Sequence, residues 1–371
     1  MLYEEKEKDI EDNKNNNQSN ETKINNNNIL NKPIITFPEN YDLTQIENMN
    51  NYLDIYQPTF KNNFELIEYL DSGSTGIVYK GKSKTKGNNQ QYAFKFCIKL
   101  SKEKRNIRNN YHEIYYQKKL HHINISEILA FYKIEDKSYF SVSEFGKFGN
   151  LDNFLHNFLK RRFLSESFIN YLSKPILESL YYMHRKKLYH MDVKKGNLVL
   201  DVEMNPKLID FSSCISFEKY TPEQEIQLSK IGTGRYMAPE LLNHEKIEVK
   251  YGDKIDVYSF GITIYNLAFG TYPYQLNSVQ SNDYDKILEK LKEEPLEIPN
   301  NVEVSNMFKD FLKKVLELDY KKRYSIKDAL EDPWIKGWNI IANEKDNTGI
   351  QENFIIRLIS DNIPKFNQYI K

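Results

Sequence analysis

Two carboxylates and an amide near the middle of the chain have the residue types and the spacing of a reaction centre. Asp192 and Asn197 lie in the string His190-Met-Asp-Val-Lys-Lys-Gly-Asn197, and Asp210 begins the string Asp-Phe-Ser eighteen residues after Asp192. Phosphoryl transfer needs a carboxylate that orients the acceptor hydroxyl, and oxygen ligands for the metal ions that hold a triphosphate. The spacing of these three side chains therefore indicates phosphoryl transfer to a hydroxyl group.

The two strings resemble the catalytic loop and the metal-binding loop of eukaryotic protein kinases. The resemblance implies that Asp192 orients the substrate hydroxyl and accepts its proton, and that Lys194 neutralises charge on the transferring phosphoryl group. It also implies that Asn197 and Asp210 are ligands of Mg²⁺. His190 is expected to be structural and to pack beneath the loop.

Two upstream segments resemble the phosphate-binding part of a kinase. Residues 71–78 resemble the glycine-rich loop, and residues 92–95 resemble the strand that carries the nucleotide-binding lysine. By this resemblance Lys95 contacts the α- and β-phosphates of ATP, and Glu113 in the next helical segment pairs with its ammonium group. Without the downstream loops, a lysine and a glutamate would be as well explained as two surface charges.

The resemblance also assigns an adenine site. Val78, Ala93 and Val199 would sandwich the base, and the backbone of Glu144 and Gly146 would hydrogen-bond its edge. The remaining positions assigned to nucleotide binding are Gly73, Gly76 and Ser143.

Residues 232–240, Gly-Thr-Gly-Arg-Tyr-Met-Ala-Pro-Glu, resemble the end of the kinase activation segment. The resemblance implies that Glu240 pairs with Arg323 and that Asp256 holds the backbone of the catalytic loop. Thr233, together with the lysine two residues after the catalytic aspartate, favours Ser or Thr over Tyr as the acceptor. The matching motifs run in the expected order from residue 64 to residue 334.

Three positions depart from the usual kinase pattern. Asp71 replaces the first glycine of the glycine-rich loop, Met191 stands where most kinases have Arg, and Ser212 where most have Gly. We expect a protein serine/threonine kinase that uses ATP and Mg²⁺ on protein substrates. Because Met191 cannot pair with a phosphate, we expect activity without phosphorylation of the activation segment. The alternative is a catalytically weak, kinase-shaped scaffold or nucleotide-binding module.

Composition is consistent with a globular protein. The 371 residues include 52 Lys and Arg and 52 Asp and Glu, so the net charge is zero and gives no whole-chain attraction to nucleic acid. Only two cysteines occur, there is no apolar run of about 18 residues, and the N-terminus lacks the apolar stretch of a signal peptide. We expect a protein of the cytoplasm that could also be present in the nucleus, without a membrane span.

The pattern of apolar residues predicts an α+β fold with a small antiparallel sheet lobe containing one main helix, followed by a larger helical lobe. We expect an Asn-rich disordered tail (1–40), a lead-in segment (41–63), a kinase domain (64–335, with lobes 64–145 and 146–335) and a C-terminal extension (336–371), which could be helical. Expected strands are 64–70, 77–81, 92–97, 128–134 and 138–144. Expected helices are 109–121, 151–159, 167–184, 253–269, 284–291 and 305–316.

Two unusual residues meet at the back of the expected adenine site. Ser143 directly precedes the hinge, and Gln117 lies four residues after Glu113 on the helix face that meets the site. A buried glutamine needs a partner, and we expect a hydrogen bond between Gln117 and Ser143. The alternative is that Gln117 turns outward to water. A small residue at position 143 also predicts an open space behind the adenine.

Overall fold

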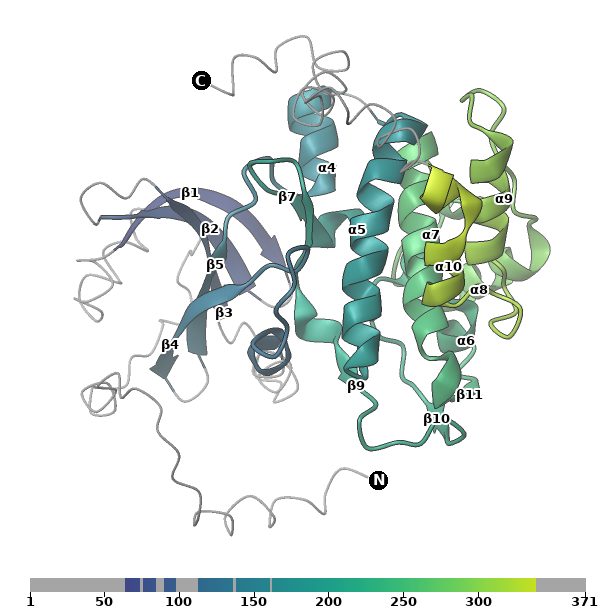
Figure 1. Ribbon diagram of the computed structural model, residues 1–371, viewed down its shortest axis with the longest axis horizontal. Coiled ribbons are helices and arrows are strands. Elements are labelled where there is room, and N and C mark those ends of the chain that lie inside the picture. The colour runs from purple at the N-terminus through teal and green to yellow at the C-terminus, as the bar shows by residue number, and fades with distance from the viewer. Residues whose placement is uncertain are drawn as a thin grey trace. The chain divides into compact units, whose positions relative to one another are not determined.

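The computed structural model describes residues 64–73, 76–84, 90–97, 113–135, 138–160 and 162–337, which all belong to one compact unit of the chain. Strands dominate the first part and helices the second (Figure 1). The expected α+β, bilobal architecture is confirmed. The expected tail, the lead-in segment and most of the C-terminal extension lie outside the described residues.

The first lobe is built on a five-stranded antiparallel sheet in the order β1-β2-β3-β5-β4. Each expected strand is present, with its ends moved by at most three residues. The strands are β1 (Phe64–Gly73), β2 (Gly76–Ser83), β3 (Gln91–Cys97), β4 (Ile128–Glu135) and β5 (Ser138–Glu144).

Alternation along the strands divides this sheet into an apolar face and a functional face. Tyr79, Phe94, Phe96 and Phe140 are fully buried on one face, where Phe96 packs against Phe140 with ring centroids 5.3 Å apart. The register pairs Lys95 with Ser141 and Ala93 with Ser143, and these residues share the opposite face. The period of two therefore places the candidate lysine on the face away from the aromatic core.

The second lobe is helical, and most of its helices match the expected segments. Residues 151–159 form one turn of α-helix followed by a π-helix, and the short helix α10 was not expected. Serine residues at the N-caps of α5, α9 and α10 accept hydrogen bonds from the first turn, which explains where these helices begin. The helices are α4 (Leu151–Asn153), α5 (Glu166–Arg185), α6 (Pro239–Leu242), α7 (Asp253–Phe269), α8 (Tyr284–Glu293), α9 (Asn306–Val315) and α10 (Ile326–Glu331).

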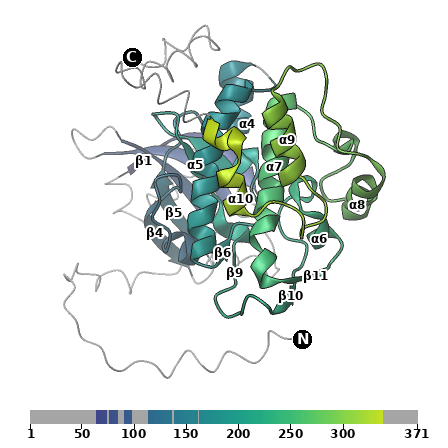
Figure 2. The ribbon, with the colours of Figure 1, turned by 45° about the vertical axis from the view of Figure 1, so that its right-hand side comes forward.

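Helix α7 forms the centre of the helical lobe. Every residue after Asp253 in this helix is buried, as the apolar sequence predicted. In both views α7 runs beside α5, with α10 against them (Figures 1 and 2). The helix ends at Gly270, whose positive φ of 65° disfavours other residues. No helix in the described ranges is long and apolar enough to cross a membrane.

Three short strand pairs frame the loops between the helices. They were not expected, because strands of two or three residues leave no periodic signal in the sequence. The pairs are β6 (Leu188–Tyr189) with β9 (Ile215–Ser216), β7 (Leu198–Leu200) with β8 (Pro206–Leu208), and β10 (Glu225–Gln227) with β11 (Lys246–Glu248).

A buried ion pair joins the start of α6 to the segment before α10. Arg323 donates to both carboxylate oxygens of Glu240, at 2.8 and 3.0 Å, and both side chains are almost completely buried. Arg323 also donates to the carbonyl oxygens of Lys254, Glu317 and Leu318. The expected Glu240–Arg323 pair is thus present, with the arginine saturated by acceptors.

We predict that Arg323→Met will lower the free energy of unfolding by about 3–5 kcal/mol, because it leaves the Glu240 carboxylate buried without a counter-charge. The matched control is Lys313→Met, since Lys313 pairs with Asp310 on the surface, where the side chains are 63% and 60% exposed. That change should cost less than about 1 kcal/mol. Urea unfolding of both variants provides the measurement, and equal losses would contradict the assigned role of the buried pair.

Candidate active site

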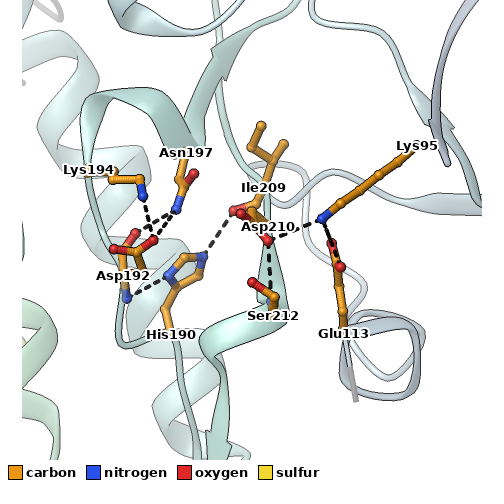
Figure 3. A network of polar contacts seen from close by, with 9 residues as sticks. All are labelled: Lys95, Glu113, His190, Asp192, Lys194, Asn197, Ile209, Asp210 and Ser212. Atoms are coloured by element: carbon orange, nitrogen blue, oxygen red, sulfur yellow. Dashed lines mark hydrogen bonds and ion pairs between the residues drawn. The ribbon is translucent and has the colours of Figure 1, made fainter. Parts of the chain in front are cut away.

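The sheet lobe and the helical lobe meet at an ion-pair chain (Figure 3). Lys95 Nζ lies 2.6 and 2.8 Å from the two carboxylate oxygens of Glu113 and 3.3 Å from Asp210 Oδ1. The expected Lys95–Glu113 pair is therefore present. Residues 113–117 are helical, so the helix ends earlier than the expected residue 121.

Glu113 and Asp210, the two carboxylates of this chain of ion pairs, differ in the direction in which their surroundings shift the pKa. Burial raises the pKa of Glu113, and the positive charge of Lys95 offsets only part of that effect. Burial would also raise the pKa of Asp210, but the charge of Lys95 and a hydrogen bond from Ser212 bring it down to about 2. Asp210 is therefore an anion at neutral pH, as a cation ligand must be.

The catalytic loop presents Asp192 with one oxygen held and one oxygen free. Asp192 Oδ2 accepts hydrogen bonds from Lys194 Nζ at 2.7 Å and from Asn197 Nδ2 at 3.1 Å. Lys194 Nζ also donates to Thr233 Oγ1 at 2.7 Å, which ties the loop to the end of the activation segment. Asp192 Oδ1 is buried and has no partner among the described residues. The carboxylate is thus oriented, with one acceptor atom left unused.

The loop backbone is held from below by Asp256. Its Oδ2 accepts from His190 N at 2.8 Å and lies 2.8 Å from His184 Nε2, and its Oδ1 accepts from Met191 N at 2.7 Å. Met191 has a φ of 67°, a conformation that non-glycine residues rarely adopt, and these bonds hold it there. The expected support of the loop by Asp256 is therefore present.

His190 is completely buried and links the two functional loops, as expected for a structural residue. Asp192 N donates to His190 Nδ1 at 3.3 Å, so the ring proton sits on Nε2, which lies 3.1 Å from the carbonyl oxygen of Ile209 (Figure 3). The imidazole thus connects the residue before Asp210 to Asp192. It is engaged at both nitrogens, which leaves none for a catalytic base.

A cavity of about 520 Å³ lies between the functional face of the sheet and the catalytic loop. Most of the residues predicted from the sequence line this cavity. Asp192 and Lys194 lie next to it: Asn197, which lines the cavity, donates to Asp192, and Lys194 donates to the same carboxylate oxygen. Gly73 pairs with Gly76 at the end of β1. The predicted residues that line the cavity are Gly76, Val78, Ala93, Lys95, Glu113, Ser143, Glu144, Gly146, Asn197, Val199 and Asp210.

Two features of the cavity were not foreseen. Gly146 approaches β7 so closely that an added Cβ would lie 2.6 Å from Val199 Cβ, so a larger residue there would push the hinge away. Lys207 Nζ lies 2.8 Å from Glu144 Oε2 and fixes the hinge to β8. The two residues of this pair are 63 positions apart and belong to no motif, so the sequence held no signal for it.

The prediction of a hydrogen bond between Gln117 and Ser143 is wrong, because Gln117 bonds to a different residue. Gln117 is buried and turns inward, as expected, but its Nε2 donates to the backbone oxygen of Ser126 at 2.7 Å. That carbonyl belongs to the segment between the helix and β4, whose approach depends on the tertiary fold. Ser143 lines the cavity without taking part in this bond.

Comparison with known sequences identifies the family. The profile of the protein kinase domain matches residues 64–335, which is more than half of the chain. The chain belongs to the protein kinase family. Members of this family use ATP and a divalent metal ion, and the cavity brings the expected lysine and metal-binding side chains together.

Individual relatives are similar at about the same level. The chain is 31% identical over 298 residues to calcium-dependent protein kinase 4 of Plasmodium berghei, covering 78% of this chain and 52% of the relative. It is 30% identical over 296 residues to serine/threonine-protein kinase 36 of Mus musculus, with 80% and 21% covered. It is 30% identical over 274 residues to serine/threonine-protein kinase TIO of Arabidopsis thaliana, with 74% and 19% covered. The chain thus matches about half or less of the length of these relatives.

We predict that Gln117→Leu will destabilise the fold by about 1–3 kcal/mol, because it leaves the buried Ser126 carbonyl without its donor. Ser143→Ala should have little effect on stability. A double-mutant cycle over positions 117 and 143, measured by chemical denaturation, should show coupling below about 0.5 kcal/mol. Strong coupling would indicate a hydrogen bond between Gln117 and Ser143 and would contradict the assignment of the Ser126 carbonyl as the partner of Gln117.

Proposed function

We propose that the protein is a serine/threonine kinase that transfers the γ-phosphoryl group of ATP to Ser and Thr hydroxyls of protein substrates. The observation that carries this proposal is the state of Asp192. One of its oxygens is fixed by Lys194 and Asn197, while the other is buried and free to accept a hydrogen bond from a substrate hydroxyl. The names of the relatives, which are serine/threonine kinases, support the same activity.

The surrounding side chains have separable roles in this proposal. Asp192 orients the acceptor hydroxyl and takes its proton. Lys194, which also contacts Thr233, places a positive charge beside the path of the phosphoryl group. Lys95, oriented by Glu113, binds the α- and β-phosphates, and the small apolar residues of the cavity hold the adenine. The network is already assembled, so substrate binding needs no rebuilding of these contacts.

The donor set fits Mg²⁺. Asp210 supplies an ionised carboxylate, and Asn197 turns its amide nitrogen to Asp192, which leaves its carbonyl oxygen for a cation. Mg²⁺ in such sites is held by one or two protein oxygens, with phosphates and water completing the octahedron. When bound, the ion neutralises charge on the phosphates.

We predict that Asp192→Asn will cut the rate of peptide phosphorylation by about 100-fold or more, while ATP affinity stays nearly unchanged. Asp210→Ala should weaken nucleotide binding only when Mg²⁺ is present, because it removes a metal ligand. Phosphorylation rates together with titration calorimetry, with and without Mg²⁺, separate the two effects. If Asp192→Asn kept the activity of the wild type, the assignment as an enzyme would be refuted.

We also propose that activity needs no phosphate on the activation segment. Met191 is buried and apolar, so it cannot bind a phosphate. The segment is instead paired with the helical lobe through β10 and β11, where Ile226 lies opposite Ile247. Two further backbone bonds extend the pairing, from Val249 N to Gln224 O and from Lys250 N to Pro222 O. Backbone pairing and apolar burial thus supply the order that a phosphate supplies elsewhere.

We predict that phosphatase-treated protein will keep its activity toward a peptide substrate. Ile226→Asp should lower activity by about tenfold or more, because a charge placed opposite Ile247 releases the segment. Glu225→Gln is the matched control, since this neighbour in β10 is exposed and should keep activity. Loss of activity on phosphatase treatment, with recovery through an acidic substitution between Ser212 and Glu240, would contradict the proposal.

A further inference from the structure

A groove on the helical lobe lies apart from the nucleotide cavity and takes no part in the proposed chemistry. It consists of two cavities, of about 600 and 500 Å³, that share Tyr274 and Pro295 in their walls. The walls come from α7 and the loop after it, from the end of α8 and the segment after it, and from α9. We call this surface the α8 groove, after the helix at the outer edge of the lobe (Figure 2).

The segment that follows α8 has the features of a strand without a partner. Its residues alternate between half-buried and exposed, which is the burial pattern of an extended strand. Pro295 and Pro299 favour this conformation, because a residue that precedes proline is restricted to extended backbone. Leu296 and Ile298 pack against the core, and Glu297 is exposed between them. No strand among the described residues pairs with this segment.

The backbone of the segment has unused hydrogen-bonding groups. The carbonyl oxygen of Glu297 accepts a hydrogen bond from the Tyr265 hydroxyl at 2.9 Å. Successive residues of a strand direct their N–H and C=O groups to opposite edges, so those of Leu296 and Ile298 point away from Tyr265. No described residue bonds to these groups. They form a short open edge with which another extended chain can pair.

Most of the charged residues in the walls that lack an ion pair are acidic. Glu294 and Lys313 form ion pairs at 2.9 and 3.2 Å with neighbours on their own helices. Lys292 is the one wall cation without an ion pair in the described part of the chain. The wall carboxylates without an ion pair there are Glu293, Glu297 and Glu317. The groove therefore carries a local negative charge on a chain whose net charge is zero.

Two further features connect the groove to function. Its wall holds Tyr274 and Gln275 in consecutive left-handed conformations, with φ of 55° and 54°, and strained backbone gathers at functional sites. Tyr272, which also lines the groove, has its hydroxyl 3.2 Å from that of Tyr236, and the guanidinium of Arg235 lies over its ring. The groove thus adjoins the end of the activation segment, which contacts the catalytic loop.

We propose that the α8 groove is a docking site for a protein substrate, and that it takes an extended segment in which basic and apolar residues alternate. The segment would pair its backbone with Leu296 and Ile298 and place its basic side chains beside Glu293 and Glu297. Such a segment matches both the open edge and the carboxylates. The site lies outside the position of the acceptor hydroxyl, and it rests on the proposed function only for the partner's being a substrate.

Labelled peptides test the groove on the full chain by fluorescence anisotropy, which needs no turnover. The probe is fluorescein-Gly-Arg-Val-Arg-Val-Arg-Gly-amide, and its matched control replaces each arginine by glutamate. We expect the basic probe to bind at least about tenfold more tightly, as a few cross-strand charge pairs would give. Probes N-methylated at the valines or at the arginines should differ in affinity by about tenfold, because only one set of N–H groups faces the open edge.

Reversal of charge locates the binding site. Glu293→Lys combined with Glu297→Lys should weaken binding of the basic probe by about tenfold or more and should strengthen binding of the glutamate peptide. A gain for the glutamate peptide cannot come from a damaged fold. Glu303→Lys is the matched control, because Glu303 is an exposed carboxylate further along the chain, outside the walls of both cavities. It should leave both affinities unchanged.

A kinetic measurement then tests the docking of substrates. The basic segment is joined through a Gly-Ser linker to a serine peptide that the chain phosphorylates. The fusion should lower KM about tenfold with kcat unchanged, because the docked segment raises the local concentration of the acceptor. The double variant should lose this gain.

The results that would overturn the proposal differ from those that would overturn the proposed function. Equal binding of the basic and glutamate peptides, or undiminished binding of the basic probe to the double variant, would refute the α8 groove. Binding of the segment without any change in KM would refute its role in substrate docking. If no peptide were phosphorylated, the proposed function would fail and the partner could not be a substrate, while anisotropy would still decide whether the groove binds the segment.

Discussion

The geometry of the active site depends on one buried carboxylate, Asp256. A carboxylate without solvent is costly unless several donors surround it, and here three donors do so, from His184 and from the backbone of His190 and Met191. Burial would raise the pKa of Asp256, but these contacts lower it, so the charge persists. The energy of those bonds keeps Met191 in a left-handed conformation and thereby aims the next residue, Asp192.

A series of contacts connects Asp256 in the helical lobe to the sheet. Asp256 sits on α7, which is buried on all sides, so the carboxylate cannot move without disrupting the core. His190 contacts the carbonyl oxygen of Ile209, and the next residue, Asp210, forms an ion pair with Lys95. Asp210 itself has a φ of 63°, a second strained residue in the same chain of contacts. The packing of an apolar helix is thus the support on which the polar site rests.

Motifs in the sequence predicted the fold and most of the site, but not the contacts that depend on tertiary approach. The pairs Lys95–Glu113 and Glu240–Arg323 could be predicted because both partners lie in recognisable strings. The partner of Gln117 could not, since a backbone carbonyl carries no residue-type signal. The strands β10 and β11 were missed for another reason: three residues are too few to show alternation.

Two of the departures from the kinase pattern, at Asp71 and Ser212, are compensated by hydrogen bonds to neighbouring groups. Asp71 Oδ1 accepts from Ser72 N, which engages part of its charge beside the cavity, and Ser212 donates to Asp210. Neither feature removes a group that the proposed chemistry needs, so the residues of the site favour an enzyme over a scaffold. The most direct measurement incubates the dephosphorylated chain with ATP, Mg²⁺ and a degenerate peptide library, and identifies phosphorylated residues by mass spectrometry. We expect phosphoserine and phosphothreonine that are absent without the enzyme; no incorporation, or phosphotyrosine alone, would contradict the assignment as a serine/threonine kinase.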